Sequence, residues 1–181
     1  MATYKGKFLG IKNPNKYVGD VNKITYRSHW ERNVMRWCDE NTEVLEWASE
    51  ELAIPYIHPL SGKRARYYPD FYMKMADGTI KVVEVKPHKE TRPPIPGKRK
   101  TKKYMDEAAK FAINAEKWAN AHVACIKNNM SFEVWTENEL KKMGILNWEV
   151  DKAVALAERR AMPKSKYNRK NPKVGPPKRR S

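Results

Sequence analysis

The sequence predicts an α/β fold, of the α+β type with a mixed sheet, and the element order αβββαβ. Three observations lead to this prediction. Apolar residues recur at helical spacing just after residue 28, two strand-like stretches flank the turn Ala76-Asp77-Gly78, and a second helical stripe precedes an apolar segment at 131–136. Helices and strands mixed along one chain bury their apolar faces by packing helices against a sheet.

The chain has 181 residues and is strongly basic. This length suits one domain with a substantial core, plus a tail. The 37 Lys and Arg against 21 Asp and Glu give a formal charge of +16 and a pI near 9.8, which predicts nucleic acid as the partner. No apolar run approaches the roughly 18 residues of a membrane-spanning helix, and no signal-peptide pattern is present. We therefore expect a soluble protein without membrane contacts.

The first half of the chain is expected to contain an arm, one helix and three strands. Glycines, a proline and scattered lysines make residues 1–23 an arm or loop. An amphipathic helix follows from about Ser28 and ends near Asn41. Strands are predicted at 52–57, where a proline suggests an edge or a bulge, and then at 64–75 and 80–86, which form a hairpin.

The second half begins with a cationic, mobile loop at 87–103, which contains four prolines. A helix is predicted at 104–121, a last strand at 131–136 and a short helix at 137–143. The chain then divides into an arm (1–23), a catalytic domain (24–148), and a C-terminal part (149–181) with a helix at 149–161. The end of this last part is basic and free of acids, so we expect it to be partly disordered until it meets DNA.

The two cysteines, Cys38 and Cys125, lie far apart in apolar surroundings. Neither has a cysteine or histidine nearby at zinc-ligand spacing. We expect both to be reduced, buried and structural.

The hairpin carries the strongest chemical signal, in Asp70 on its first strand and Glu84 and Lys86 on its second. Strand side chains alternate, so Glu84 and Lys86 leave one face about 7 Å apart. Phosphodiester hydrolysis needs a divalent cation held by oxygen ligands, which two converging carboxylates supply. Asp70 and Glu84 fit that role, and Lys86 can hold the attacking water or offset charge on the phosphate. The Glu-x-Lys triplet alone is not specific, because Glu139-Leu-Lys141 repeats it, and a solvated hairpin face is the alternative.

The position of Asp70 relative to Glu84 depends on the turn between their strands. A two-residue Asp77-Gly78 loop would pair Asp70 with Val85 and send the two carboxylates to opposite faces. A three-residue loop with Gly78 in the left-handed conformation pairs Asp70 directly with Glu84. The metal site therefore requires the three-residue loop or a bulge nearby.

Glu31, on the first helix, is the third acidic candidate. Its spacing from Ser28 also matches a capping box, in which the glutamate accepts a hydrogen bond from an amide at the helix start. Local sequence slightly favours the cap, and the two roles compete for one carboxylate.

Basic residues that flank the presumed cleft are candidate DNA contacts, with a solvated surface as the alternative for each. His29 is a weaker candidate for a DNA or site contact because it neighbours Glu31, and the other histidines form no metal spacing. The tryptophans lie on predicted core faces, so we assign them no function. The candidate DNA contacts are Arg27, Arg64, Arg66, Lys98, Arg99, Lys100, Lys102 and Lys103.

The order of these motifs resembles the PD-(D/E)xK nuclease superfamily, and within it the N-terminal catalytic domain of transposon end-cleaving endonucleases. The motifs are a helix with Glu31, then Tyr68-Pro69-Asp70, Val83-Glu84-Val85-Lys86-Pro87, a helix, and Phe132-Glu-Val-Trp-Thr136-Glu137. The head completion nucleases of T-even-type tailed bacteriophages are more similar still, over about residues 4–146. That likeness is carried by Lys23-Ile-Thr-Tyr-Arg-Ser28-x-Trp30-Glu31, Ile54-Pro-Tyr56 and Lys86-Pro-x-Lys-Glu-Thr91-x-Pro-Pro94.

The resemblance implies a restriction-endonuclease-like core and cleavage of double-stranded DNA near the phage portal or neck before the tail attaches. The protein would act in the host cytoplasm during assembly, or in the virion. The position of Glu31 matches the family's helical acid, which raises it from a cap to a site residue. We expect Glu31, Asp70, Glu84 and Lys86 to be catalytic. One or two Mg²⁺ ions, replaceable by Mn²⁺, would be bound by Asp70, Glu84, the Val85 carbonyl and Glu31, with no small-molecule cofactor.

Two other functions stay open on the sequence. A DNA-binding structural protein of the virion neck would keep the fold and use charge alone. The intact acids and lysine argue against it, since a carboxylate cluster without a metal destabilises a fold by like-charge repulsion. A junction-resolving or repair nuclease of the same fold would share the chemistry and differ in its substrate.

Overall fold

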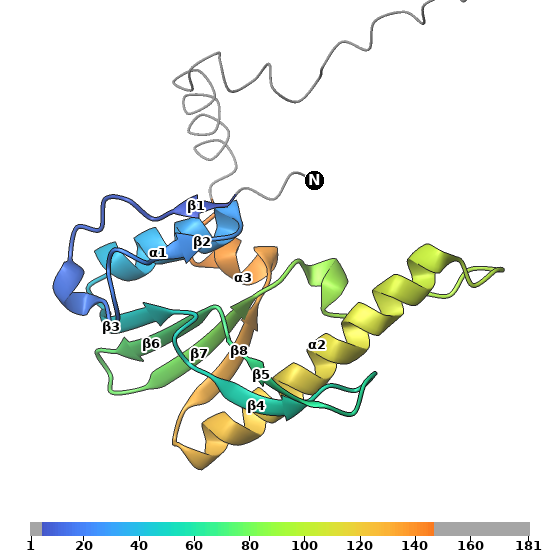
Figure 1. Cartoon of the computed structure of the whole chain (residues 1–181). Coiled ribbons are helices and arrows are strands. Elements are labelled where there is room, and N and C mark those ends of the chain that lie inside the picture. The colour runs from blue at the N-terminus through green and yellow to red at the C-terminus, as the bar shows by residue number, and fades with distance from the viewer. Residues whose placement is uncertain (1–4, 147–181) are drawn as a thin grey trace, which may run out of the picture. The chain divides into compact units, whose positions relative to one another are not determined.

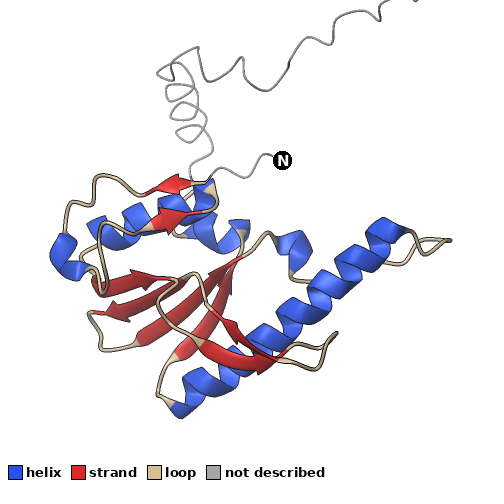
Figure 2. Cartoon of the chain, in the orientation of Figure 1, coloured by secondary structure: helices blue, strands red, loops and turns tan. Residues whose placement is uncertain are grey.

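The structure is a computed structural model that describes residues 5–146 of the chain. The expected helix at 149–161 and the basic tail lie outside the described residues. Within 5–146, helices pack against a central mixed sheet, which confirms the predicted fold class (Figure 1; Figure 2). No helix in this range is long and apolar enough to cross a membrane.

The central sheet has four strands in the order β3, β6, β7, β8. These are β3 (Val44–Ser49), β6 (Phe71–Met75), β7 (Ile80–Val85) and β8 (Ser131–Trp135). β3, β6 and β7 pair antiparallel, whereas β7 and β8 pair parallel. A parallel pair needs a long crossover, which α2 (Lys102–Lys127) supplies between β7 and β8.

The helices begin and end close to their predicted positions. α1 (His29–Glu40) is capped by Ser28 and ends at Asn41, as the apolar spacing predicts. The predicted short helix is α3 (Glu137–Lys142), which starts in a capping box. α2 has 26 residues and runs past the predicted span 104–121, because buried small residues continue its apolar stripe.

The two faces of β7 contact different elements because its side chains alternate. Val83 and Val85 belong to the main core, which includes residues of α1 and α3. Glu84 and, beyond the strand, Lys86 therefore lie on the opposite face, the one that α2 covers (Figure 1).

A separate two-stranded ribbon lies against α2. It pairs β4 (Ile54–Ile57) with β5 (Arg64–Tyr67) in antiparallel register. Tyr56 and Tyr67 on its inner face form a second apolar cluster with Ala121 of α2. Within the described chain β4 pairs only with β5, so it is an edge strand, as its proline suggests.

The strand predictions need two corrections. The predicted strand 64–75 is two strands, β5 and β6, in different sheets. Tyr68-Pro69-Asp70 separates them, since Pro69 has no N–H to donate and its side chain is fully buried. β3 is absent from the prediction because an irregularity between Val44 and Glu46 breaks its alternation. The described residues thus contain more strands than the predicted order αβββαβ.

Residues 5–23 pack onto the domain, in place of the arm that the sequence suggests. β1 (Gly6–Lys7) pairs with β2 (Thr25–Tyr26), and a short 3-10 helix, η1 (Pro14–Lys16), lies between them in sequence. These elements are too short to leave a periodic pattern in the sequence.

Aromatic packing and one buried carboxylate hold this segment in place. The rings of Phe8 and Tyr17 meet the Trp47 indole edge-on, with centroids 6.1 and 4.7 Å away. Asp39, buried at the end of α1, accepts hydrogen bonds from the amides of residues 12 and 13 at 2.6 and 2.9 Å. All of these contacts join residues far apart in sequence, so local patterns do not reveal them.

Both cysteines are buried and neither forms a disulfide, as predicted. Cys38 lies on α1 in the main core and Cys125 on α2. Burial raises the pKa of each thiol, which keeps both thiols protonated and unreactive.

The turn between β6 and β7 sets the register on which the predicted site depends. Phe71 lies opposite Val83, and a hydrogen bond from the Met75 amide to the Thr79 carbonyl at 2.8 Å leaves a three-residue loop, 76–78. The loop ends at Gly78, whose φ of 84° is left-handed. Extending the pairing by one residue places Asp70 opposite Glu84, on the same face. The predicted three-residue register is confirmed.

Gly78 offers a direct test of this turn. A Cβ at Gly78 would meet no atom within 4 Å, so the effect of Gly78→Ala comes from the backbone alone. We expect Gly78→Ala to lower the free energy of unfolding by about 1 kcal/mol, measured in urea. Gly78→Asn should destabilise less, because Asn tolerates the left-handed conformation.

Gly97→Ala is the matched control, since Gly97 has no positive φ and an open environment. It should change stability by less than about 0.5 kcal/mol. Equal effects of Ala at both positions would contradict a left-handed requirement at Gly78.

Candidate active site

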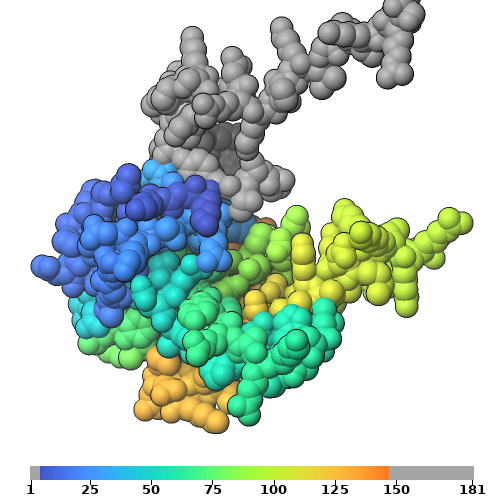
Figure 3. All heavy atoms as spheres, in the orientation of Figure 1, coloured from blue at the N-terminus to red at the C-terminus, as the bar shows by residue number. Residues whose placement is uncertain are grey.

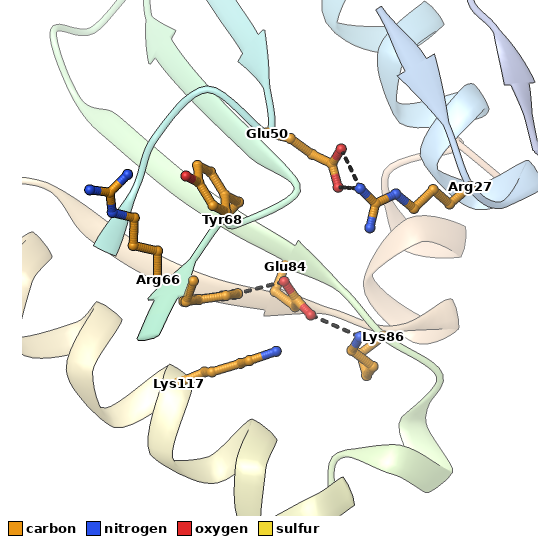
Figure 4. Close-up of a pocket in the computed structure, with 8 residues that line it drawn as sticks. Arg27, Glu50, Arg66, Tyr68, Glu84, Lys86 and Lys117 are labelled. Carbon is orange, nitrogen blue, oxygen red and sulfur yellow. Dashed lines mark hydrogen bonds and ion pairs between the residues drawn. The ribbon is translucent and has the colours of Figure 1, made fainter. Parts of the chain in front are cut away.

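A polar cavity of about 480 Å³ opens beside the end of β7, on the face that α2 covers (Figure 4). It collects residues from the loops around α1 and β3, from β5, from β7 and from α2. The residues that line it are Arg27, Glu50, Arg66, Tyr67, Tyr68, Glu84, Lys86 and Lys117.

Glu84 is the buried centre of this cavity. Only 6% of the residue is exposed, and its two carboxylate oxygens have different partners. Oε2 accepts a hydrogen bond from the Tyr67 hydroxyl at 2.7 Å, and Oε1 lies 2.8 Å from the Lys86 ammonium. Burial, and then the negative charge of Glu84, raise the pKa of the Tyr67 hydroxyl. The hydroxyl therefore stays protonated and donates the hydrogen bond.

Asp70 lies at the same end of the sheet. Its Oδ2 accepts a hydrogen bond from the Val85 amide at 2.7 Å. Burial, then the negative charges of Glu84 and Glu31, raise the pKa of the Asp70 carboxyl well above its ordinary value. The Val85 hydrogen bond and the Lys86 charge act in the opposite direction but do not outweigh them. Glu84 and Glu31 are therefore both close enough to Asp70 to repel a charge on its carboxylate.

Lys86 offsets part of this repulsion. Burial alone would lower the pKa of its ammonium, but the charge and hydrogen bond of Glu84, together with Asp70, outweigh burial and raise the pKa. Lys86 therefore stays charged near neutral pH, one residue beyond the end of β7.

Glu31 is bonded to the start of α1 without closing the full capping box, because its carboxylate accepts from the Arg27 amide and not from that of the N-cap Ser28. The Ser28 hydroxyl accepts a hydrogen bond from the Glu31 amide at 3.1 Å and donates one to the Glu31 carboxylate at 2.8 Å. The second carboxylate oxygen accepts a hydrogen bond from the Arg27 amide at 2.7 Å. These hydrogen bonds and the closeness to Asp70 coexist. Glu31 is bonded to the helix start, and its charge still contributes to the raised pKa of Asp70.

The donor set at the end of β7 suits a hard divalent cation. It offers the Asp70 and Glu84 carboxylates, and a cation would offset the repulsion that, together with burial, raises the Asp70 pKa. The Lys86 amide donates a hydrogen bond to the Trp135 carbonyl of β8. Because backbone groups of successive strand residues point to opposite sides, the N–H and C=O of Val85 point toward β6 instead, beside Asp70. Within residues 5–146 no group of three His, Cys, Asp or Glu side chains is arranged to hold a metal. A backbone carbonyl and water would have to complete the ligands.

The predicted basic residues divide into two groups. Arg27 and Arg66 line the cavity, and Arg64 lies two residues before Arg66 on the same exposed face of β5. The others lie in the loop before α2 and in its first turn, which project from the body of the domain (Figure 3). The members of this second group are Lys98, Arg99, Lys100, Lys102 and Lys103, and none of them lines the cavity.

Three cavity residues were not singled out from the sequence. Tyr67 directly precedes Tyr68-Pro69-Asp70, so its place beside the site could have been inferred. Glu50 follows β3 with a left-handed φ of 57° and pairs with Arg27 at 2.9 Å. Lys117 comes from the middle of α2. For Glu50 and Lys117 only the tertiary fold gives the position.

Replacement of Asp70 tests the repulsion among the acids. A carboxyl whose pKa is raised on folding favours the folded state below its ordinary pKa of 3.8, and this contribution is lost as pH rises through the raised pKa. Asp70→Asn keeps an acceptor for the Val85 amide and carries no charge. With chelator present, we expect its melting temperature to exceed that of the parent at neutral pH. The increase should be about 2–4 °C for each kcal/mol by which removal of the charge raises the free energy of unfolding.

The difference in melting temperature between Asp70→Asn and the parent should shrink toward zero as pH falls to about 4, where the Asp70 carboxyl of the parent is also neutral. Thermal melts across this range measure it. A variant less stable than the parent at neutral pH would contradict the repulsion.

Comparison with known proteins places this chain in a family. Residues 41–137 match the family described as TnsA-like endonuclease N terminal, a stretch that includes Asp70, Glu84 and Lys86 and begins after Glu31. The head completion nuclease of Enterobacteria phage T4 is 39% identical over 145 residues, covering 78% of this chain and 96% of that protein. No solved structure matches. The chain therefore belongs to the TnsA-like N-terminal endonuclease family, of the PD-(D/E)xK type.

Proposed function

We propose that this chain is a magnesium-dependent endodeoxyribonuclease that cuts double-stranded DNA. The observation that carries the proposal is the juxtaposition of Asp70, Glu84 and Lys86 at one end of the β6–β7 hairpin, set by the three-residue turn, where Glu84 and Lys86 line the cavity. The formal charge of +16 supports a polyanionic substrate. Mn²⁺ should substitute for Mg²⁺, because both accept oxygen ligands.

In the proposed mechanism Asp70, Glu84 and the Val85 carbonyl would hold the cation. A bound divalent cation polarises the phosphoryl group and lowers the pKa of a coordinated water. Tyr67 keeps Glu84 oriented through its 2.7 Å hydrogen bond. Lys86, charged and already at the cavity, moves its ammonium from Glu84 toward the attacking water or the phosphate. Glu31 orients water or contributes to a second ion site.

The biological setting follows from the phage T4 relative, which this chain matches over nearly that protein's whole length. We propose that this chain acts in phage head completion, on packaged DNA at the portal or neck before the tail attaches. Its partners would be double-stranded DNA and head or neck proteins. Its place would be the host cytoplasm during assembly.

A plasmid nicking assay tests the enzyme. With Mg²⁺ the parent should nick, and chelator should abolish the activity. Asp70→Asn and Lys86→Ala should each lower the nicking rate about 10²-fold or more, because each removes charge at the reacting centre. Lys141→Ala, in the second Glu-x-Lys triplet on α3, is the matched control and should keep the parent rate.

Equal nicking by the parent, Asp70→Asn and Lys86→Ala, all shown to be folded, would reject the catalytic assignment. DNA binding without nicking by any of them would favour the structural DNA-binding protein.

Glu31→Gln separates capping from chemistry. Gln can serve in a capping box, so the variant should keep the parent stability within about 0.5 kcal/mol. If Glu31 takes part in catalysis, the nicking rate should fall about 10²-fold, since the carboxylate charge is lost. Parent-level nicking by a stable Glu31→Gln protein would leave Glu31 with the cap alone.

A further inference from the structure

Four cations line the cavity, and two of them already have carboxylate partners. Arg27 pairs with Glu50 at 2.9 Å, and Lys86 pairs with Glu84 at 2.8 Å. Within residues 5–146, neither Arg66 nor Lys117 forms a salt bridge. The cavity lining thus has two more cations than glutamates, and two of its cations are available to an incoming anion.

Aromatic rings, rather than acids, hold Lys117 in place. Its ammonium lies 5.9 Å from the centroid of the Tyr56 ring and 5.6 Å from that of the Tyr67 ring. Such cation–π contacts orient a charge without neutralising it. The preceding Glu116 is no partner either, because adjacent residues of a helix do not face each other, and its carboxylate accepts a hydrogen bond from Asn120 at 2.9 Å.

The position of Lys117 relative to the reacting groups is equally defined. The ring that supports it belongs to Tyr67, whose hydroxyl binds Glu84. Figure 4 shows the Lys117 side chain extending from α2 toward Glu84 and Lys86. α2 and the residue that follows β7 thus each present one lysine to the same cavity.

An ammonium that is charged, partly desolvated and without an anionic partner binds an anion more strongly than one in bulk water. The anion that the proposed nuclease function brings to this cavity is a DNA phosphodiester. Arg66 is less constrained, because it lies on the exposed face of the β4–β5 ribbon.

We propose that Lys117 binds a non-bridging oxygen of a DNA phosphate that enters the cavity, and so positions the phosphate against Glu84 and Lys86. The proposal rests on the nuclease function and assigns a substrate contact that the motif residues do not include.

The test compares the full chain with Lys117→Gln, Lys117→Arg and the control Lys127→Gln, on the same helix but outside the cavity. Binding to a short labelled DNA duplex is measured in chelator over a range of salt concentrations, and single-turnover nicking in Mg²⁺. Melting temperatures establish that each variant is folded.

We expect Lys117→Gln to weaken binding about ten-fold and to reduce the slope of log affinity against log salt by about one. Its nicking rate at low protein concentration should fall at least as much. Lys117→Arg should keep the salt slope, because it keeps the charge. Lys127→Gln should keep the parent affinity and nicking rate.

Parent affinity and salt slope in folded Lys117→Gln would overturn the phosphate contact, even if the parent nicks DNA. Loss of affinity in Lys117→Arg equal to that in Lys117→Gln would also overturn it, since packing rather than charge would then be responsible. Failure of the nuclease function shows itself separately, as an inactive parent, and the binding measured in chelator still decides whether Lys117 contacts phosphate.

Discussion

The pairing of β6 with β7 is the constraint on which the site depends. Three residues in the turn, closed by a left-handed Gly78, bring Asp70 to the face of Glu84. A shift by one residue would also turn the apolar side chains of one strand to the opposite face of the sheet from those of the other, so the core and the site enforce the same register. Val83 and Val85 anchor that register from the core side.

This register brings acidic and basic side chains together at the end of β7. Burial and then the charges of its acidic neighbours raise the pKa of Asp70, and the Val85 amide and Lys86 only partly compensate. Polar groups arranged in this way contribute little to the stability of a fold and are typical of sites that need a charged ligand. Nothing in the packing of the main core requires them, because that core lies on the other face of the sheet.

The elements that the sequence predicts are those with strong local patterns: α1 with its Ser28 cap, the hairpin with its glycine turn, and the last strand and helix. Asp70, Glu84 and Lys86 are predicted from that hairpin, whereas Glu31 on α1 became a candidate through the family resemblance. Sequence reasoning misses β3, whose alternation is interrupted, and the packing of the N-terminal segment, where Tyr17 meets Trp47 across thirty residues. It also misses Glu50 and Lys117, because a charged residue on a loop or helix has no local feature that marks it as part of a distant cavity.

The length of α2 has a geometric consequence. Lys102 at its start and Lys117 at the cavity are fifteen residues apart on one uninterrupted helix, which separates them by about 22 Å along its axis. Successive base pairs of B-form DNA are about 3.4 Å apart, so a duplex lying along α2 would span about six or seven base pairs between these lysines. The helix therefore sets a fixed distance between the cavity and the projecting basic loop.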